Sequence, residues 1–115
     1  VLLEETENIQ ETIDTITSII EDYEEEGLES IAVITKKKED LKEISHNLKE
    51  KVKILTFDRN DILYKGGKVL IPAYFAKGLE FDGVIILEDE EEIPNLVKYI
   101  MATRALHRLS VIKQK

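Results

Sequence analysis

The sequence contains no cysteine, which excludes disulfide bonds and thiolate metal sites and makes a reducing, cytoplasmic setting the expected one. It also lacks an apolar run of membrane-spanning length and a signal-peptide pattern, so we expect no membrane segment. His46 and His107 have no carboxylate at metal-ligand spacing, and no Ser/His/Asp set stands out. We therefore expect no metal site. Because the chain begins with Val1 rather than methionine, we expect a fragment of a longer protein.

Basic residues are absent from the first 35 positions, which hold 11 acidic residues. The remaining positions hold the other 13 acidic residues and all 16 lysines and arginines, so that part carries a net charge of +3. The overall charge of −8 argues against a free-standing nucleic-acid binder. A local basic groove on the mildly basic part is still compatible with this distribution.

The acidic segment has the apolar periodicity of an amphipathic helix over residues 6–26. We expect Thr6 to cap its start and Gly27 to follow its end. The sequence thus predicts a helical arm, residues 1–29, packed on or beside a domain of residues 30–115. An arm that docks on another domain or protein is the alternative. The apolar stripe consists of Ile9, Ile13, Ile16, Ile20 and Tyr23.

The rest of the chain alternates short apolar runs with helical patterns. We expect helices over residues 37–50 and from Pro94 to about Ala105. This order predicts an α/β fold with a mostly parallel sheet flanked by helices. The predicted strands are Ser30–Thr35, Val52–Leu55, Val69–Ile71, Val84–Leu87 and Leu109–Ile112.

A polar insert, Ala76–Asp82, separates two of these strands and reads Ala-Lys-Gly-Leu-Glu-Phe-Asp. Open α/β sheets place ligand sites at strand ends. Lys77, Gly78 and Glu80 supply a cation, a flexible backbone and a carboxylate, which suit a nucleotide or phosphate contact. A plain surface turn is the other interpretation of the insert alone.

A second pattern, Tyr-x-x-x-Thr-Arg-Ala at residues 99–105, follows the insert. In this order and spacing, the pair resembles two late motifs of the superfamily 1 helicases of the UvrD/Rep type, closest to the helicase IV (HelD-like) branch. The resemblance covers about residues 30–112. It implies a RecA-like second motor domain that shares an ATP site with an N-terminal motor domain. That other domain would supply the phosphate loop and the Mg²⁺ ligands.

The resemblance also implies roles at the ATP site. Arg104 matches the arginine finger, whose charge stabilises the transferring phosphoryl group. Glu80 matches a glutamate that accepts a hydrogen bond from the ribose, and Gly78 allows close backbone approach. Lys36 stands where the family has an arginine that reaches the γ-phosphate, although lysine lacks the bidentate fork. Without the resemblance, Arg104 is a helix-end charge and Lys36 part of a solvated charge run.

Two further residues match positions near single-stranded DNA. Tyr74 replaces a family histidine and is able to stack on a base or pack in the core. Lys77 is expected near the DNA track or in a structural role. Pro72 replaces a family threonine and offers no backbone N–H to a phosphate. The expected DNA contact is therefore weaker than the ATP contact.

A phosphate loop is missing from the sequence, because the glycine pair in Lys65–Lys68 lacks the required spacing and following helix. No Asp-Glu pair follows a hydrophobic strand in the helicase arrangement. The chain thus holds half an active site, and we predict that alone it neither hydrolyses ATP nor unwinds DNA. Two alternatives remain: an ATP-driven remodeller of a nucleic-acid-bound complex such as RNA polymerase, and a non-catalytic interaction module.

Overall fold

The computed structural model describes residues 2–35, 44, 46–48, 55–56, 67–72, 80–88 and 105–114, and the structural statements below concern these residues. The first elements are a strand β1 and a helix α1. Residues 44 and 46–48 are also helical. No helix within these ranges is long and apolar enough to cross a membrane. The elements are β1 (Leu2–Thr6), α1 (Ile9–Glu25), β2 (Ser30–Thr35), β3 (Leu55–Thr56), β4 (Gly67–Pro72), β5 (Phe81–Glu88) and β6 (Ala105–Gln114).

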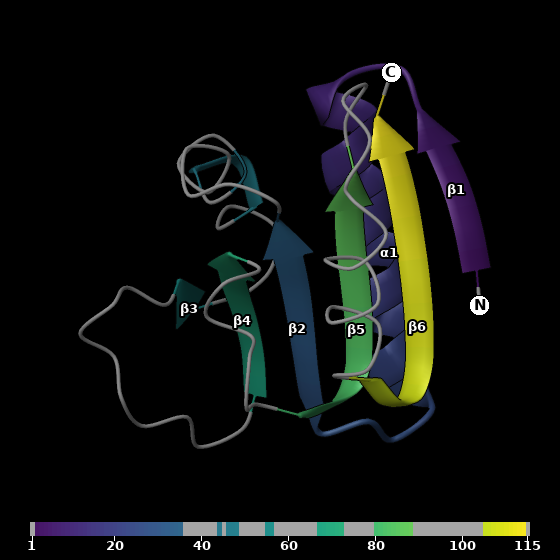
Figure 1. Cartoon of the computed structure of the whole chain (residues 1–115), viewed down its shortest axis with the longest axis vertical. Helices are drawn as coiled ribbons and strands as arrows, with labels where there is room; N and C mark the ends of the chain where they lie inside the picture. Colours follow the sequence, from purple (N-terminus) through teal and green to yellow (C-terminus); the bar gives the residue numbers. More distant parts are fainter. Residues whose placement is uncertain are drawn as a thin grey trace.

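The strands form one six-stranded sheet in the order β1-β6-β5-β2-β4-β3 (Figure 1), and each neighbouring pair is parallel. The predicted α/β fold with a parallel sheet is confirmed. β2 has the predicted bounds, whereas β4, β5 and β6 extend beyond the apolar runs that predicted them. The helix predicted from Pro94 to about Ala105 does not include Ala105, which begins β6, and the rest of that helix lies outside the described residues.

The first strand, β1, was not predicted, since residues 2–6 were assigned to the helical arm. Its five residues pair with β6, more than 100 positions later in the chain, from Leu2↔Ser110 to Thr6↔Gln114. With two leucines followed by two glutamates, this segment shows neither the alternating apolar pattern of a strand nor the apolar periodicity of a helix. Its conformation is therefore fixed by the distant partner strand. Whether residues 1–29 act as a separate arm stays a prediction.

The start of α1 also differs from the expectation. Thr6 does not cap the helix; it ends β1, and its buried hydroxyl lies 2.7 Å from the hydroxyl of Thr12. The cap is Asn8, whose Oδ1 accepts a hydrogen bond of 2.9 Å from the backbone N–H of Glu11. Asparagine is as good an N-cap as any residue type. The helix therefore begins three residues later than predicted.

The end of α1 matches the prediction at Gly27, which has a positive φ of 89°. Its N–H donates to the carbonyl of Glu24 at 3.0 Å, and the N–H of Leu28 donates to the carbonyl of Tyr23 at 3.1 Å. This pair of bonds is a Schellman motif, in which glycine avoids the steric cost of the left-handed conformation. The motif turns the chain sharply from α1 toward β2.

Both faces of the sheet carry buried apolar side chains. One face packs against α1 and the helical residues Ile44 and Leu48. The chain moves the same way across the sheet from β1 to β2 and from β2 to β3, so right-handed connections place both helical segments on the same face. On the α1 face the strands contribute Ile31, Val33, Leu70, Ile85, Leu87 and Ile112, and on the other face Ala32, Ile34, Val69, Ile71, Phe81, Val84 and Ile86.

Gly83 in β5 sets how closely the last turn of α1 approaches the sheet. A Cβ atom at this position would lie 2.6 and 2.8 Å from two ring carbons of Tyr23. Tyr23 is buried, and its hydroxyl shares a hydrogen bond with the buried Ser110 in β6. Burial raises the pKa of the Tyr23 hydroxyl, partly offset by this hydrogen bond. The ring thus contacts both β5 and β6, and it leaves space for no more than a hydrogen atom on the Cα of Gly83.

We predict that Gly83→Ala destabilises the protein by about 1–3 kcal/mol, the usual cost of overpacking a close contact. Chemical denaturation of both proteins measures the difference. The same substitution in a Tyr23→Val background should cost much less, because the ring that collides with the methyl group is gone. An alanine that stabilises the wild-type background would show that the ring does not limit this contact.

Candidate functional site

Glu80 is the one predicted site residue that the described ranges include, and it is exposed. It directly precedes β5, at the end of the sheet where the parallel strands begin. The next residue, Phe81, pairs with Ala105 at the start of β6. Ala105 is the chain neighbour of Arg104. The sheet therefore pairs the chain neighbours of the predicted ribose contact and the predicted arginine finger.

β2 and β4 finish at the opposite end of the sheet, where the parallel strands end. There Thr35 pairs with Pro72, and Thr35 is the chain neighbour of Lys36. The register Ile31↔Gly83 places Thr35 seven residues beyond the level of Glu80, or about 23 Å along the strands. Lys36, Tyr74, Lys77, Gly78 and Arg104 themselves lie outside the described residues.

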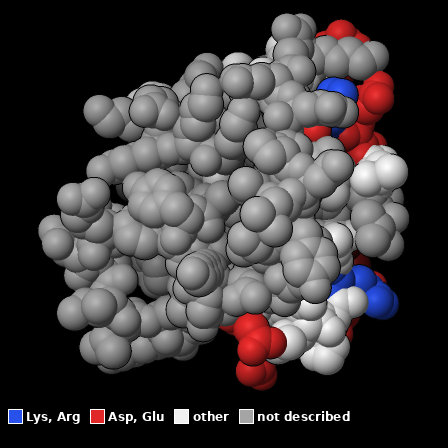
Figure 2. All heavy atoms as spheres, in the orientation of Figure 1, with Lys and Arg blue, Asp and Glu red and all other residues white. Residues whose placement is uncertain are grey.

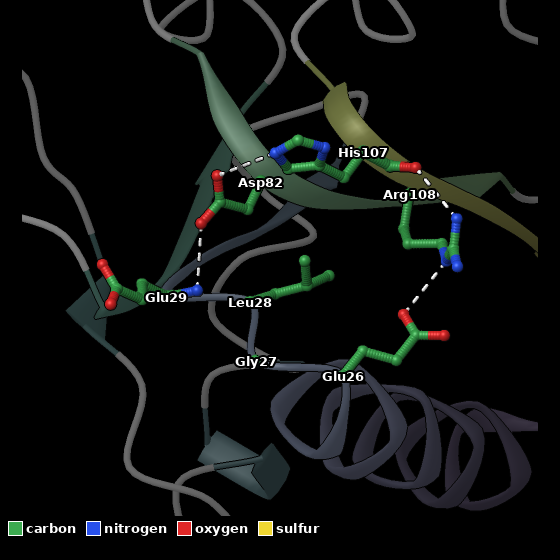
Figure 3. Close-up of a pocket in the computed structure, with 7 residues that line it drawn as sticks. All are labelled: Glu26, Gly27, Leu28, Glu29, Asp82, His107 and Arg108. Carbon is green, nitrogen blue, oxygen red and sulfur yellow. Dashed lines mark hydrogen bonds and ion pairs between the residues drawn. The ribbon is translucent and has the colours of Figure 1, made fainter.

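A cavity of about 420 Å³ lies at the end of the sheet that holds Glu80, between the turn after α1 and the starts of β5 and β6. Figure 3 shows side chains from these three places converging around it. Charged groups of both signs line it. The lining residues are Glu26, Gly27, Leu28, Glu29, Asp82, His107 and Arg108.

Asp82 joins the starts of β5 and β2. Its Oδ2 accepts hydrogen bonds from the backbone N–H groups of Glu29 at 2.9 Å and Ser30 at 3.2 Å. Its own N–H donates to the Ser30 hydroxyl at 2.9 Å. The bond from Glu29 is the largest of several causes that hold the pKa of the Asp82 carboxyl below its ordinary value. Both N–H donors favour the charged form.

His107 contacts Asp82 because β6 contains a bulge. Phe81 pairs with Ala105, but Gly83 pairs with Arg108, so β6 has one extra residue over this interval. A bulge re-aims side chains, and bulges are frequent beside functional sites. Here the Nε2 of His107 lies 3.9 Å from the Oδ1 of Asp82. This carboxylate partner was not predicted, because it comes from a neighbouring strand and not from local spacing.

Arg108 ties β6 to the end of α1. Its Nε donates to the Oε2 of Glu26 at 3.0 Å, as the close-up shows (Figure 3). Both side chains are about half exposed, so the pair adds little stability by itself. Its effect is to orient a cation and an anion at the rim of the cavity.

The described part of the chain offers partial means to hold a nucleotide. The exposed Glu80 carboxylate is a suitable acceptor for a ribose hydroxyl. Within the described residues, no group of three or more side chains is arranged to hold a metal ion.

Comparisons with known proteins bear on the fold. No family model matches the chain. No curated protein matches it either. Among solved structures, the chain is similar to the C-terminal domain of a possible DNA helicase from Lactobacillus plantarum WCFS1, with a TM-score of 0.84 and 23% identity over 97% of this chain and 72% of that one. At this identity the likeness establishes a shared fold.

We predict that Asp82→Asn removes part of the acid sensitivity of the fold. Because the folded-state pKa of Asp82 is lowered, its stabilising contribution is present above the ordinary carboxyl range and is lost as the pH falls through the lowered pKa. Stability measured by denaturation from about pH 5 downward should fall less steeply in the variant. The control is His107→Gln, which should keep most of the slope, since the backbone bond from Glu29 is the larger cause. Equal slopes for wild type and Asp82→Asn would contradict the assignment.

Proposed function

We propose that this chain is the C-terminal RecA-like motor domain of an ATP-dependent DNA helicase or translocase of the superfamily 1 UvrD/Rep type. In this proposal Arg104 is the arginine finger, Glu80 contacts the ribose and Gly78 allows close backbone approach. Lys36 follows the end of β2, about 23 Å along the strands from the level of Glu80, so Lys36 is left out of the proposed ATP site. The N-terminal motor domain of the same polypeptide supplies the phosphate loop. Tyr74 and Lys77 lie on the side that meets single-stranded DNA.

The pairing of Phe81 with Ala105 is the observation that carries the proposal. Phe81 follows Glu80 in the first motif, and Ala105 follows Arg104 in the second. Their pairing brings two motifs that are far apart in sequence together at the amino-terminal ends of β5 and β6. The shared fold with the C-terminal domain of a possible DNA helicase supports the same assignment. The exposed Glu80 carboxylate is available to a ligand at this end of the sheet.

The chemistry asked of this chain is limited to charge and position. Bound ATP and Mg²⁺ supply the phosphoryl group and its main counter-charge. Arg104 donates hydrogen bonds to phosphate oxygens as negative charge spreads over them, and it is in place only when the two motor domains close. Glu80 fixes the nucleoside, which orients the phosphates for attack by water. Each step requires the second domain, so the isolated chain is inactive in this proposal.

We predict that Arg104→Ala lowers ATP turnover by roughly 10³-fold in a polypeptide that contains both motor domains, while ATP still binds. Steady-state hydrolysis with and without single-stranded DNA measures turnover, and nucleotide titration measures binding. Glu80→Ala should instead raise KM more than it lowers kcat, because a ribose contact is made equally in the ground and transition states.

Arg108→Ala is the matched control, since it removes an arginine four residues away that is already bonded to Glu26. It should leave turnover within a few-fold of the wild type. Unchanged turnover in Arg104→Ala would exclude the finger and favour a non-catalytic interaction module. Stimulation by RNA polymerase in place of DNA would favour the remodelling alternative.

A further inference from the structure

The strand β1 forms one end of the sheet and has an open side. It pairs with β6 along its whole length, and no other described strand lies beside it (Figure 1). Alternate residues of such a strand direct their N–H and C=O groups away from the sheet, where another chain is able to pair with them. Charged side chains, proline and bulges commonly protect such edges; β1 has no proline or bulge, and its charges are the carboxylates of Glu4 and Glu5.

The two faces of β1 differ in character. The Thr6 side chain points toward α1, because its hydroxyl contacts Thr12. Alternation along the strand puts Glu4 on the same face and Leu3 on the opposite one. Leu3 is 72% exposed, the most exposed large apolar side chain among the described residues. The edge strand therefore offers the Glu4 carboxylate on one face, and Leu3 together with Glu5 on the other.

A groove of about 310 Å³ runs between β1 and α1 on the Glu4 face. Its charged lining consists of carboxylates, and we call it the acidic groove. In Figure 2 acidic side chains, with basic side-chain atoms among them, lie where Figure 1 has the end of β1 and the start of α1; the groove itself lies on the α1 side of the sheet, behind this view. The groove is lined by Glu4, Asp14, Thr15, Ser18, Ile19 and Asp22.

The charge of this surface selects among occupants. Nucleic acid is disfavoured, because its phosphates would meet carboxylates on a segment with 11 acidic residues and no basic ones. A second copy paired edge to edge would bring two acidic grooves together, and like charges on neighbouring strands repel. A basic protein segment is attracted to the same carboxylates that repel nucleic acid and a second copy of the chain.

We propose that the open edge of β1 and the acidic groove form a docking site for an extended segment of another protein in which basic residues alternate with apolar ones. The segment adds a strand beside β1. Its basic side chains enter the acidic groove, and its apolar side chains cover Leu3. Backbone bonds supply much of the affinity, and the alternation supplies specificity. This inference is independent of the proposed ATPase.

The test uses the 115-residue protein and a short synthetic peptide in which lysine alternates with valine. Fluorescence anisotropy should show saturable binding that weakens with salt, and the backbone amide signals of Leu2–Thr6 should shift. Two control peptides, one with glutamate in place of lysine and one with the same residues in shuffled order, should bind weakly. Asp14→Asn with Asp22→Asn should weaken binding roughly tenfold.

The matched control variant is Glu21→Gln with Glu24→Gln, which removes two charges from the same helix outside the groove and should keep wild-type affinity. Glu24 lies on the other side of α1, 3.6 Å from Lys68 of β4. Four results would overturn the proposal: no saturable binding, equal binding of the shuffled peptide, equal loss in both double variants, or shifts of the β1 amides with single-stranded DNA. Concentration-dependent dimers that shift the same amides would instead assign the edge to a second copy.

Discussion

The contact between Gly83 and the ring of Tyr23 determines where the end of α1 lies relative to the starts of β5 and β6. With only a hydrogen on Gly83, the ring reaches β5 and its hydroxyl bonds Ser110 of β6. The last turn of α1 is thereby fixed across two strands, and Gly27 then turns the chain into β2. A larger residue at 83 would lift the helix end from the end of the sheet that holds Glu80.

The polar contacts around Asp82 depend on that placement. Asp82 bonds the backbone N–H of Glu29 because the turn after α1 brings residues 28–30 beside the start of β5. His107 and Arg108 then reach Asp82 and Glu26 from β6. The starts of three strands and the end of one helix are joined within a few residues of Phe81 and Ala105. These contacts fix the spacing between the starts of β5 and β6.

The sequence predicted those parts of the fold whose signal is local. β2 is a run of β-branched residues bounded by polar ones, so its bounds were correct, and Gly27 was recognised because a left-handed position after a helix favours glycine. β1 was missed because its pairing partner lies at the other end of the chain. The contact of His107 with Asp82 was missed for the same reason, because it depends on the register between two strands and no residue spacing within one segment indicates it. Gly83 did have a signal, because an isolated glycine in an apolar strand often marks close backbone approach.

The charge of the chain is unevenly distributed along its sequence. The first 35 residues supply β1, α1 and β2 and hold 11 acidic residues and no basic one, whereas the remainder, with 13 acidic and 16 basic residues, has a net charge of +3. The acidic side chains of β1 and α1 make the described surface of these two elements repellent to phosphate. Nucleic acid and nucleotide are therefore directed away from β1 and the outer face of α1. The same surface is left to groups of positive charge, which in a protein partner are lysine and arginine.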